Sequence, residues 1–332
     1  MLAVGTDCAN AHPGCNAKAD KPTIFRHLEI ATNTSPQTLI YTTLSALAQA
    51  CSRHCRAPVL MPLYEPRPNV GYYPSRSAMI DVATHHWTAS DGIQLAWREC
   101  GEGRPVILLH GLFSDAEMNW IKFGHAERIA AEGFRVIMPD LRAHGLSGKP
   151  HEHVHYPQLV LVRDLVELID QLDLKDFDLG GFSLGARTTI ESVIAGVKPR
   201  RAILAGTGLD VLTNWDRRSR FYVEAIETFD RTSRGDPHWL AIQFMKTMKI
   251  DREAARLLLG TMRDREDKHA MVDAFTMPTL VVCGDQDDDN GSAPELASIL
   301  PDAHYAEVPG THMSSVTKPP LGEAIAKFLS AS

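Results

Sequence analysis

The stretch Asp176–Ala195, DFDLGGFSLGARTTIESVIA, places a serine between two glycines where a strand pattern changes to a helical pattern. The small residues Gly181 and Gly185 allow a strand to turn sharply into a helix with the Ser183 hydroxyl at the apex. The N-terminus of that helix offers free N–H groups and a partial positive charge, which suit a developing oxyanion. We therefore take Ser183 as a candidate nucleophile.

The sequence on both sides of this stretch predicts an α/β fold. Continuous apolar runs of strand length, which are typical of buried parallel strands, alternate with amphipathic helical patterns. Such alternation implies right-handed crossovers and a mostly parallel sheet covered by helices on both faces. The runs are PVILLHG (105–111), RVIMPD (135–140), FDLGG (177–181), RAILAG (201–206) and TLVVCG (279–284).

Two further patterns flank these strands. Residues 85–100 read as two strands around an Asp91-Gly92 turn, a dipeptide that suits a tight hairpin. Residues 158–174 predict a helix with its leucines and valines on one face, while the polar residues Arg163, Asp164 and Glu167 point away from that face.

The chain divides at about residue 80. Residues 1–80 have scattered Pro, Asn, Thr and His and no sustained period, so we expect an N-terminal extension that is poorly ordered or an artefact of the assigned start site. Residues 81–332 form the α/β domain. Strand patterns stop between about 208 and 277, where a charged, helix-rich segment predicts an inserted lid. Its basic run, 216–220, reads as a solvated helix face.

Composition restricts the partners. The net charge of −7 argues against a footprint for nucleic acid or anionic lipid, so we expect a small-molecule partner. No window holds the roughly 20 apolar residues of a membrane helix. A mildly apolar run ends in an Ala-x-Ala pattern at 48–50, as an export signal would, but it lies far from Met1 and follows no cationic segment. We expect a cytoplasmic protein, and the sequence leaves its oligomeric state open.

A serine nucleophile needs a base, and the base needs an orienting acid. The segment VPGTHMSSV offers His312, and the end of the strand before it offers four acids. The order Ser, Asp, His along the chain is the one expected for this kind of elbow. After the first long strand, the backbone N–H of Leu112, or alternatively that of Phe113, could join that of Leu184 as an oxyanion hole. The acids are Asp285, Asp287, Asp288 and Asp289.

Five ordered motifs give the chain, from about residue 85 to its end, a resemblance to the α/β-hydrolase superfamily. They are HGLFSD, DLRAHGLS (140–147), the Ser183 elbow, MPTLVVCGDQD and VPGTHM. The closest branch is that of serine esterases, lactonases and carbon-carbon bond hydrolases with a helical lid. The resemblance selects Asp287 over Asp285 as the acid, because the family acid usually lies three residues after the glycine that ends its strand. Ala186 and Thr311 stand where this family more often has glycine.

The resemblance implies hydrolysis of a small-molecule carboxylic ester, lactone or thioester through Ser183, His312 and Asp287, with an acyl-enzyme intermediate. Carbon-carbon bond hydrolysis and perhydrolysis use the same triad, and the fold also serves as a non-catalytic receptor. A serine at the elbow argues against dehalogenase and epoxide hydrolase activity, because those relatives use a carboxylate there. The sequence does not identify the natural substrate.

Neither a metal nor a cofactor is expected. Residues 285–296 imitate the start of a calcium loop, but Asn290 stands at the sixth position and Leu296 at the twelfth, where the loop needs Gly and Glu. The run HEHVH (151–155) lies in a loop with only Glu152 as a carboxylate at ligand spacing.

Overall fold

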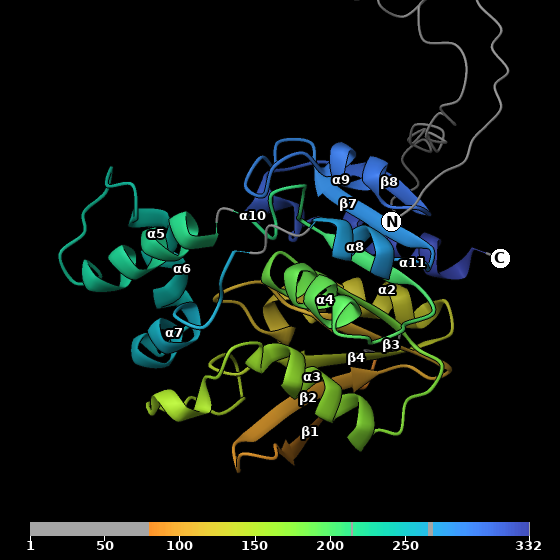
Figure 1. Ribbon diagram of the computed structural model, residues 1–332, viewed down its shortest axis with the longest axis horizontal. Helices are drawn as coiled ribbons and strands as arrows, with labels where there is room; N and C mark the ends of the chain where they lie inside the picture. Colours follow the sequence, from red (N-terminus) through yellow and green to blue (C-terminus); the bar gives the residue numbers. More distant parts are fainter. Residues whose placement is uncertain (1–79, 214, 265–267, 332) are drawn as a thin grey trace, which may run out of the picture. The chain divides into compact units, whose positions relative to one another are not determined.

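The structure is a computed structural model that describes residues 80–213, 215–264 and 268–331. Its strands form one sheet in the spatial order β1-β2-β4-β3-β5-β6-β7-β8 (Figure 1), with β1 and β2 antiparallel to their neighbours and the other strands parallel to one another. The strands are β1 (Ala83–Thr88), β2 (Gln94–Cys100), β3 (Arg104–Leu109), β4 (Phe134–Asp140), β5 (Asp178–Phe182), β6 (Ala202–Ala205), β7 (Thr279–Gly284) and β8 (Ala303–Val308). The predicted mostly parallel sheet and the predicted hairpin are confirmed. The extension predicted for 1–80 lies outside the described residues except for Ile80.

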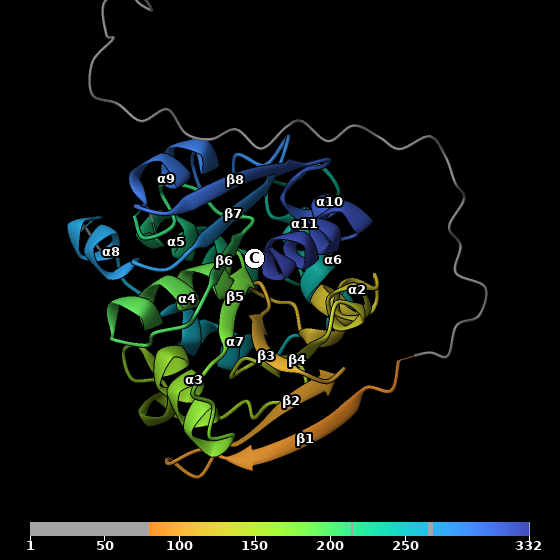
Figure 2. The same cartoon turned by 90° about the vertical axis from the view of Figure 1, so that its right-hand side faces the viewer.

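Helices cover both faces of the sheet (Figure 2). The helices α2 (His125–Ala131) and α11 (Pro319–Ser330) lie on one face, and α3 (Val160–Gln171), α4 (Leu184–Ile194), α8 (Lys268–Ala274) and α9 (Ala293–Ile299) lie on the other. In β3, Val106 and Leu108 pack toward α2 and α11, whereas Ile107 and Leu109 pack toward α3 and α4. Both faces of the strand are therefore buried, which explains why its sequence is a continuous apolar run.

The α3 helix departs from the sequence prediction at one residue. Leu161, Leu165 and Leu168 are buried as expected. Asp164, predicted to point away from the core, is also buried, because the guanidinium of Arg142 donates to both of its carboxylate oxygens at 2.8 Å. A fully paired carboxylate can occupy a buried position that an unpaired one could not.

The segment between β6 and β7 contains α5 (Trp215–Glu227), α6 (Trp239–Thr247) and α7 (Arg252–Leu259), followed by α8. Helix α5 packs against α6 and α7, and Figure 1 shows these three helices grouped together. Helix α8 instead packs against α4 in the layer that covers the sheet. We refer to α5, α6 and α7 as the inserted helices.

The chain order of the strands locates the crevice of the sheet. From β3 the chain passes to β4 on one side and then to β5 on the other side, so the strand order switches between β3 and β5. In an open parallel sheet, the carboxyl ends of strands at such a switch point form the ligand-binding crevice. Ser183 follows β5 directly. No helix in the described ranges has the length and apolar character needed to cross a membrane.

Candidate active site

The turn between β5 and α4 holds Ser183 in an unusual backbone conformation, with φ 54° and ψ −108°. Few residues other than glycine adopt this region, so surrounding contacts must hold it. The neighbouring glycines permit those contacts. A Cβ on Gly181 would lie 2.3 Å from the carbonyl carbon of Gly185, and a Cβ on Gly185 would lie 2.2 Å from the carbonyl oxygen of Leu109. Ala186, in contrast, is fully buried in a cluster of apolar side chains, where its methyl group is accommodated.

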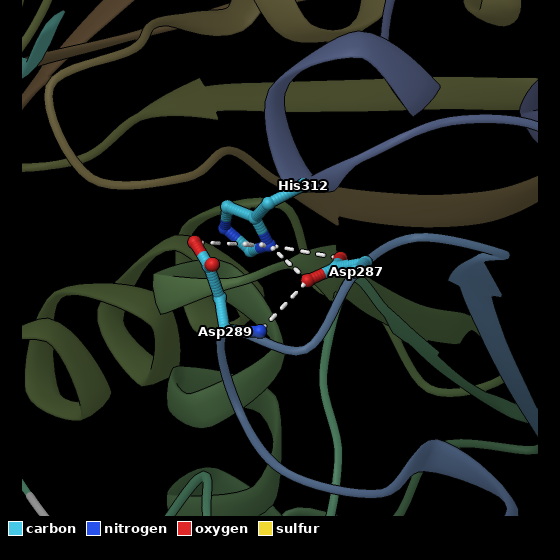
Figure 3. A group of neighbouring side chains, drawn as sticks. All are labelled: Asp287, Asp289 and His312. Atoms are coloured by element: carbon cyan, nitrogen blue, oxygen red, sulfur yellow. Dashed lines mark hydrogen bonds and ion pairs between the residues drawn. The ribbon is translucent and has the colours of Figure 1, made fainter.

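The three residues predicted for the triad form one hydrogen-bonded chain. The Ser183 hydroxyl lies 2.9 Å from His312 Nε2, and His312 Nδ1 lies 2.9 Å from Asp287 Oδ2 and 3.1 Å from its Oδ1. Figure 3 shows the imidazole facing the Asp287 carboxylate. The competing acid, Asp285, accepts a 2.7 Å hydrogen bond from the backbone N–H of Gly310. Asp287 therefore lies where it can orient the His312 ring, whereas Asp285 is hydrogen-bonded to the loop that precedes His312.

The electrostatic state of Asp287 suits this arrangement. Burial alone would raise the pKa of its carboxyl group, but the hydrogen bond and charge of His312 and the backbone N–H of Asp289 outweigh it and lower the pKa below its ordinary value. Asp287 is thus ionised at neutral pH. An ionised carboxylate at Nδ1 holds the imidazole with a proton on that atom, which leaves Nε2 free to accept the serine proton.

His312 begins the short helix α10 (His312–Ser315). Thr311 caps this helix with its hydroxyl, which accepts from the N–H of Ser314 at 3.3 Å, and the Ser314 hydroxyl accepts from the N–H of Thr311 at 2.9 Å. This reciprocal pair is a capping box. The φ of Thr311 is −82°, so the position does not require the glycine that is more common there.

Neither of the two backbone N–H groups predicted for the oxyanion hole has a hydrogen-bond partner among the described residues. Leu184 is the first residue of α4, and the first N–H groups of a helix have no intrahelical partner. In the described part of the chain, no hydrogen bond uses the N–H of Leu112. The alternative donor, Phe113, already donates to His144 Nε2 at 3.0 Å. The geometry therefore favours Leu112 over Phe113.

Two buried histidines, to whose side chains the sequence assigned no role, hold the loop that carries Leu112. His144 Nε2 accepts from Phe113, and its Nδ1 donates to the carbonyl of Arg142 at 2.9 Å. His110 Nε2 accepts from the N–H of Leu141 at 2.9 Å, and its Nδ1 donates to the carbonyl of Gly111 at 2.8 Å. Burial lowers the pKa of His144 to about 3 and also lowers that of His110. Both rings are therefore neutral, with one nitrogen accepting and the other donating.

Asp140 and Arg142 anchor the neighbouring loop, 140–147. The buried Asp140 carboxylate accepts from the N–H groups of Ala116 at 2.8 Å and Leu146 at 2.7 Å, and it pairs with Arg98 at 3.1 Å. Arg142 is fully buried and reaches Asp91 as well as Asp164, which joins the loop to both the hairpin and α3. These partners are distant in sequence, so only the motif DLRAHGLS signalled that the loop is structured.

Two of the triad side chains and Asp289 form a group that could also supply metal ligands. Asp287, Asp289 and His312 each offer an atom within 4.8 Å of the others (Figure 3). A metal ion would need a lone pair on His312 Nδ1, the nitrogen that faces the ionised Asp287. The arrangement therefore fits an acid and an imidazole better than it fits a cation. Asp289, more exposed, has an oxygen 4.0 Å from the same nitrogen.

The run HEHVH contacts carboxylates of residues that lie about 100 positions further along the chain. His151 Nε2 lies 2.9 Å from Asp251, and its Nδ1 lies 3.2 Å from Glu253. Asp251 is the N-cap residue of α7. The pair links the loop before α3 to the inserted helices, and the hydrogen bond that the Asp251 carboxylate accepts raises the pKa of His151.

A small cavity lies directly above Ser183. It leaves about 10 Å³ for the centre of a water-sized molecule, which is the space of about one water. The wall contains Leu112 and Leu184, which carry the candidate oxyanion donors, and Trp215 and Arg218 from α5, together with Arg187, Val211 and Asn290. The basic run 216–220 was predicted to be solvated. Arg217 and Arg220 are exposed as expected, but Arg218 is half-buried in this wall.

Comparison with known proteins agrees with this architecture. A family described as alpha/beta hydrolase fold matches residues 104–191. An epoxide hydrolase of Caballeronia sordidicola is 37% identical over 98 residues, which cover 30% of this chain and 29% of that protein. A Bacillus subtilis strain 168 protein, named as a 2-succinyl-6-hydroxy-2,4-cyclohexadiene-1-carboxylate synthase, is 25% identical over 280 residues, 75% of this chain and all of its own length. The solved esterase of Exiguobacterium antarcticum superimposes with a TM-score of 0.62 at 22% identity, over 74% of this chain and 99% of that chain.

Proposed function

Because the chain belongs to the α/β-hydrolase superfamily, we propose that it is a serine hydrolase that cleaves small-molecule carboxylic esters, or the related lactones and thioesters. The observation that carries the proposal is the unbroken chain of hydrogen bonds from the Ser183 hydroxyl through His312 to Asp287. The free N–H groups of Leu112 and Leu184 beside the serine support it. The protein is proposed to act in the cytoplasm without a metal or organic cofactor.

The proposed reaction has two steps. His312 Nε2 takes the proton of Ser183 as its oxygen attacks the carbonyl carbon, and Asp287 stabilises the imidazolium that forms. The N–H groups of Leu112 and Leu184 hold the resulting oxyanion, and the loss of one such donor typically costs about 3 kcal/mol of transition-state stabilisation. His312 then protonates the leaving group. A water activated by the same histidine hydrolyses the acyl enzyme and releases Ser183.

A second candidate is cleavage of a carbon-carbon bond, or perhydrolysis, on the same triad. The observation that favours a reaction other than ester hydrolysis is that the Bacillus subtilis relative, whose name denotes a synthase, is matched over its whole length. The epoxide hydrolase likeness covers less than a third of either chain. Ser183 stands at the elbow where an epoxide hydrolase of this family would need a carboxylate, so we do not extend that activity to this protein.

The test compares wild type with Ser183→Ala on p-nitrophenyl esters of increasing acyl length, together with fluorophosphonate labelling read by intact mass. We expect serine-dependent turnover and one adduct at Ser183. Labelling without ester turnover would favour the carbon-carbon candidate. The absence of both would contradict the proposal and leave the non-catalytic receptor as the better interpretation.

A further inference from the structure

The cavity above Ser183 contains two arginines, Arg187 and Arg218. A neutral ester offers a guanidinium group no charge to pair with, and a cation in a half-buried wall is stabilised by an anionic partner. The two arginines must therefore be distinguished by the partners that each already has.

Arg187 is already neutralised within the protein. Its guanidinium lies 2.9 Å from the Glu191 carboxylate one turn along α4, and it also donates to the carbonyl oxygens of Val211 and Arg263. It stacks over the ring of Trp215 with 5.0 Å between the guanidinium carbon and the ring centroid. These contacts use its charge and join α4 to the inserted segment, so Arg187 is a structural residue of the cavity wall.

Arg218 has no such partner. Among the described residues, its guanidinium makes one hydrogen bond, from Nη1 to the backbone carbonyl of Asp289 at 3.3 Å, and no carboxylate lies within 4.0 Å of it. The carboxylate of Asp289, whose carbonyl accepts that bond, has an oxygen 4.0 Å from His312 Nδ1 (Figure 3). A guanidinium carries five N–H donors, so most of those of Arg218, a residue that lines the cavity, have no hydrogen-bond partner among the described residues.

We propose that Arg218 binds a carboxylate group of the substrate, so that the hydrolase acts on anionic esters. This inference rests on the proposed function. A planar guanidinium can donate two parallel hydrogen bonds to one carboxylate, which fixes both its place and its orientation. Arg218 lines the same small cavity as Ser183, Leu112 and Leu184. The carboxylate therefore lies only a few bonds from the carbonyl that Ser183 attacks, as in a half-ester of a short dicarboxylic acid.

The test is a pair of esters matched in length. Mono-p-nitrophenyl succinate carries a carboxylate on the acyl side, and p-nitrophenyl butyrate does not. We expect wild type to favour the succinate ester and Arg218→Gln to lower the succinate-to-butyrate ratio of kcat/KM by at least about tenfold, since hydrogen bonds to charged groups are the stronger ones. A second pair, 4-acetoxybenzoate against phenyl acetate, tests a carboxylate on the leaving group.

Arg217→Gln is the matched control, because it removes the same charge from the adjacent, exposed residue of α5. It should leave both ratios unchanged, and Arg218→Lys should restore part of the loss. Equal ratios in wild type and Arg218→Gln for both ester pairs would overturn the inference. An equal loss in Arg217→Gln would also overturn it, because the effect would then reflect net charge alone.

Failure of the proposed function gives a different result. If neither ester pair is hydrolysed, succinate is tested for its ability to slow fluorophosphonate labelling of Ser183. Protection in wild type that is lost in Arg218→Gln supports the carboxylate site even though ester hydrolysis is contradicted. Labelling without protection overturns the inference. If Ser183 is not labelled at all, both the proposed function and the inference are contradicted.

Discussion

Different forces hold the inserted helices and the edge of the sheet at the carboxyl ends of β3 and β5, which carries Leu112 and Ser183. At the edge, hydrogen bonds and close backbone contacts hold the groups in position. His144 accepts a hydrogen bond from the loop that carries Leu112, and Gly185 lies against the backbone of Leu109 at the elbow. The inserted helices pack mainly through buried apolar side chains such as Met245 and Leu258. Their polar links to the rest of the chain include the pair of His151 with Asp251.

This difference predicts where substitutions matter. A hydrogen-bonded or sterically closed position tolerates few residue types, so a single change at the edge should act on activity directly. An apolar face tolerates many residues of similar size. Substitutions in the inserted helices should therefore alter which substrate fits, while the reaction itself continues.

The largest effect is expected from the acid of the triad. Asp287→Asn keeps the shape of the side chain but no longer favours the proton on His312 Nδ1, so kcat should fall about 10⁴-fold. Asp289→Asn is the control, because its oxygen lies 4.0 Å from the same nitrogen. We expect it to lower kcat by less than about tenfold, since it makes no hydrogen bond to the imidazole. Steady-state kinetics on one ester would contradict the assignment if the two variants lost activity equally.

A side chain added at the tightly packed elbow should have the next largest effect. In Gly185→Ala the new Cβ meets the carbonyl oxygen of Leu109 at 2.2 Å, so β3 or α4 must shift. Overpacking of this kind typically costs about 1–3 kcal/mol of stability, and a shift of Ser183 by about 1 Å can cost roughly 100-fold in rate. Urea unfolding and kcat measure the two effects.

Gly260→Ala, at the end of α7, is the matched control. Its nearest atom is 3.3 Å from the added Cβ, and its φ is −70°. It should leave both stability and rate almost unchanged. Equal losses in the two variants would show that the edge is no more sensitive than the inserted helices.

Buried histidine should make the edge sensitive to acid. The pKa of His144 is about 3 in the folded protein, against about 6.5 in an unfolded chain, so between these values the unfolded state binds the extra proton. Above pH 6.5 the His144 ring is neutral in both states and does not lower the free energy of unfolding. As pH falls from 6.5 toward 3, the free energy of unfolding decreases. Between pH 7.5 and 5 the loss is about 2 kcal/mol.

Urea unfolding at the two pH values tests this contribution. His144→Gln should show a smaller fall in the free energy of unfolding than wild type, by about 2 kcal/mol. His153→Gln, which replaces an exposed histidine, should follow wild type. If all three proteins lose the same stability between pH 7.5 and 5, the buried ring is not the cause.

The smallest effect is expected on the outer side of the inserted helices. The side chain of Leu240 in α6 is 75% exposed, so Leu240→Ser should change the free energy of unfolding by less than about 0.5 kcal/mol. Thermal unfolding and kcat/KM on the ester series measure it. A selective loss on long acyl chains would instead show that this surface contacts substrate.

The sequence predicted the elements and residues whose constraints are local. Ser183 was found from the glycines that its turn requires, His312 and the acidic loop from their places after β8 and β7, and the strands from their apolar runs. In each case, the sequence signal lies in residues a few positions apart. Asp287 was selected over Asp285 only through the resemblance, and the structure shows it facing His312.

The residues that sequence reasoning missed depend on partners far along the chain. The sequence places Asp164 on the surface because it does not show the pairing with Arg142. It gives His151 too few carboxylates because the partner, Asp251, lies in another part of the chain. Arg218 looked like part of a solvated face, because nothing in its own helix shows that this side covers Ser183. Such pairings follow from tertiary packing and leave no mark at helical or strand spacing.

The cavity above Ser183 has room for about one water, so the fraction of molecules in which it is wider could set the affinity for substrate. If the side chains of α5 that line it, Trp215 among them, must move aside before an acyl group enters, only the open molecules bind substrate. The apparent dissociation constant is then the intrinsic constant divided by the fraction of open molecules, so an open fraction of about one in a hundred would weaken apparent affinity about 100-fold. A substitution that loosens α5 would therefore strengthen apparent binding, even though every atom of the triad stays where it is.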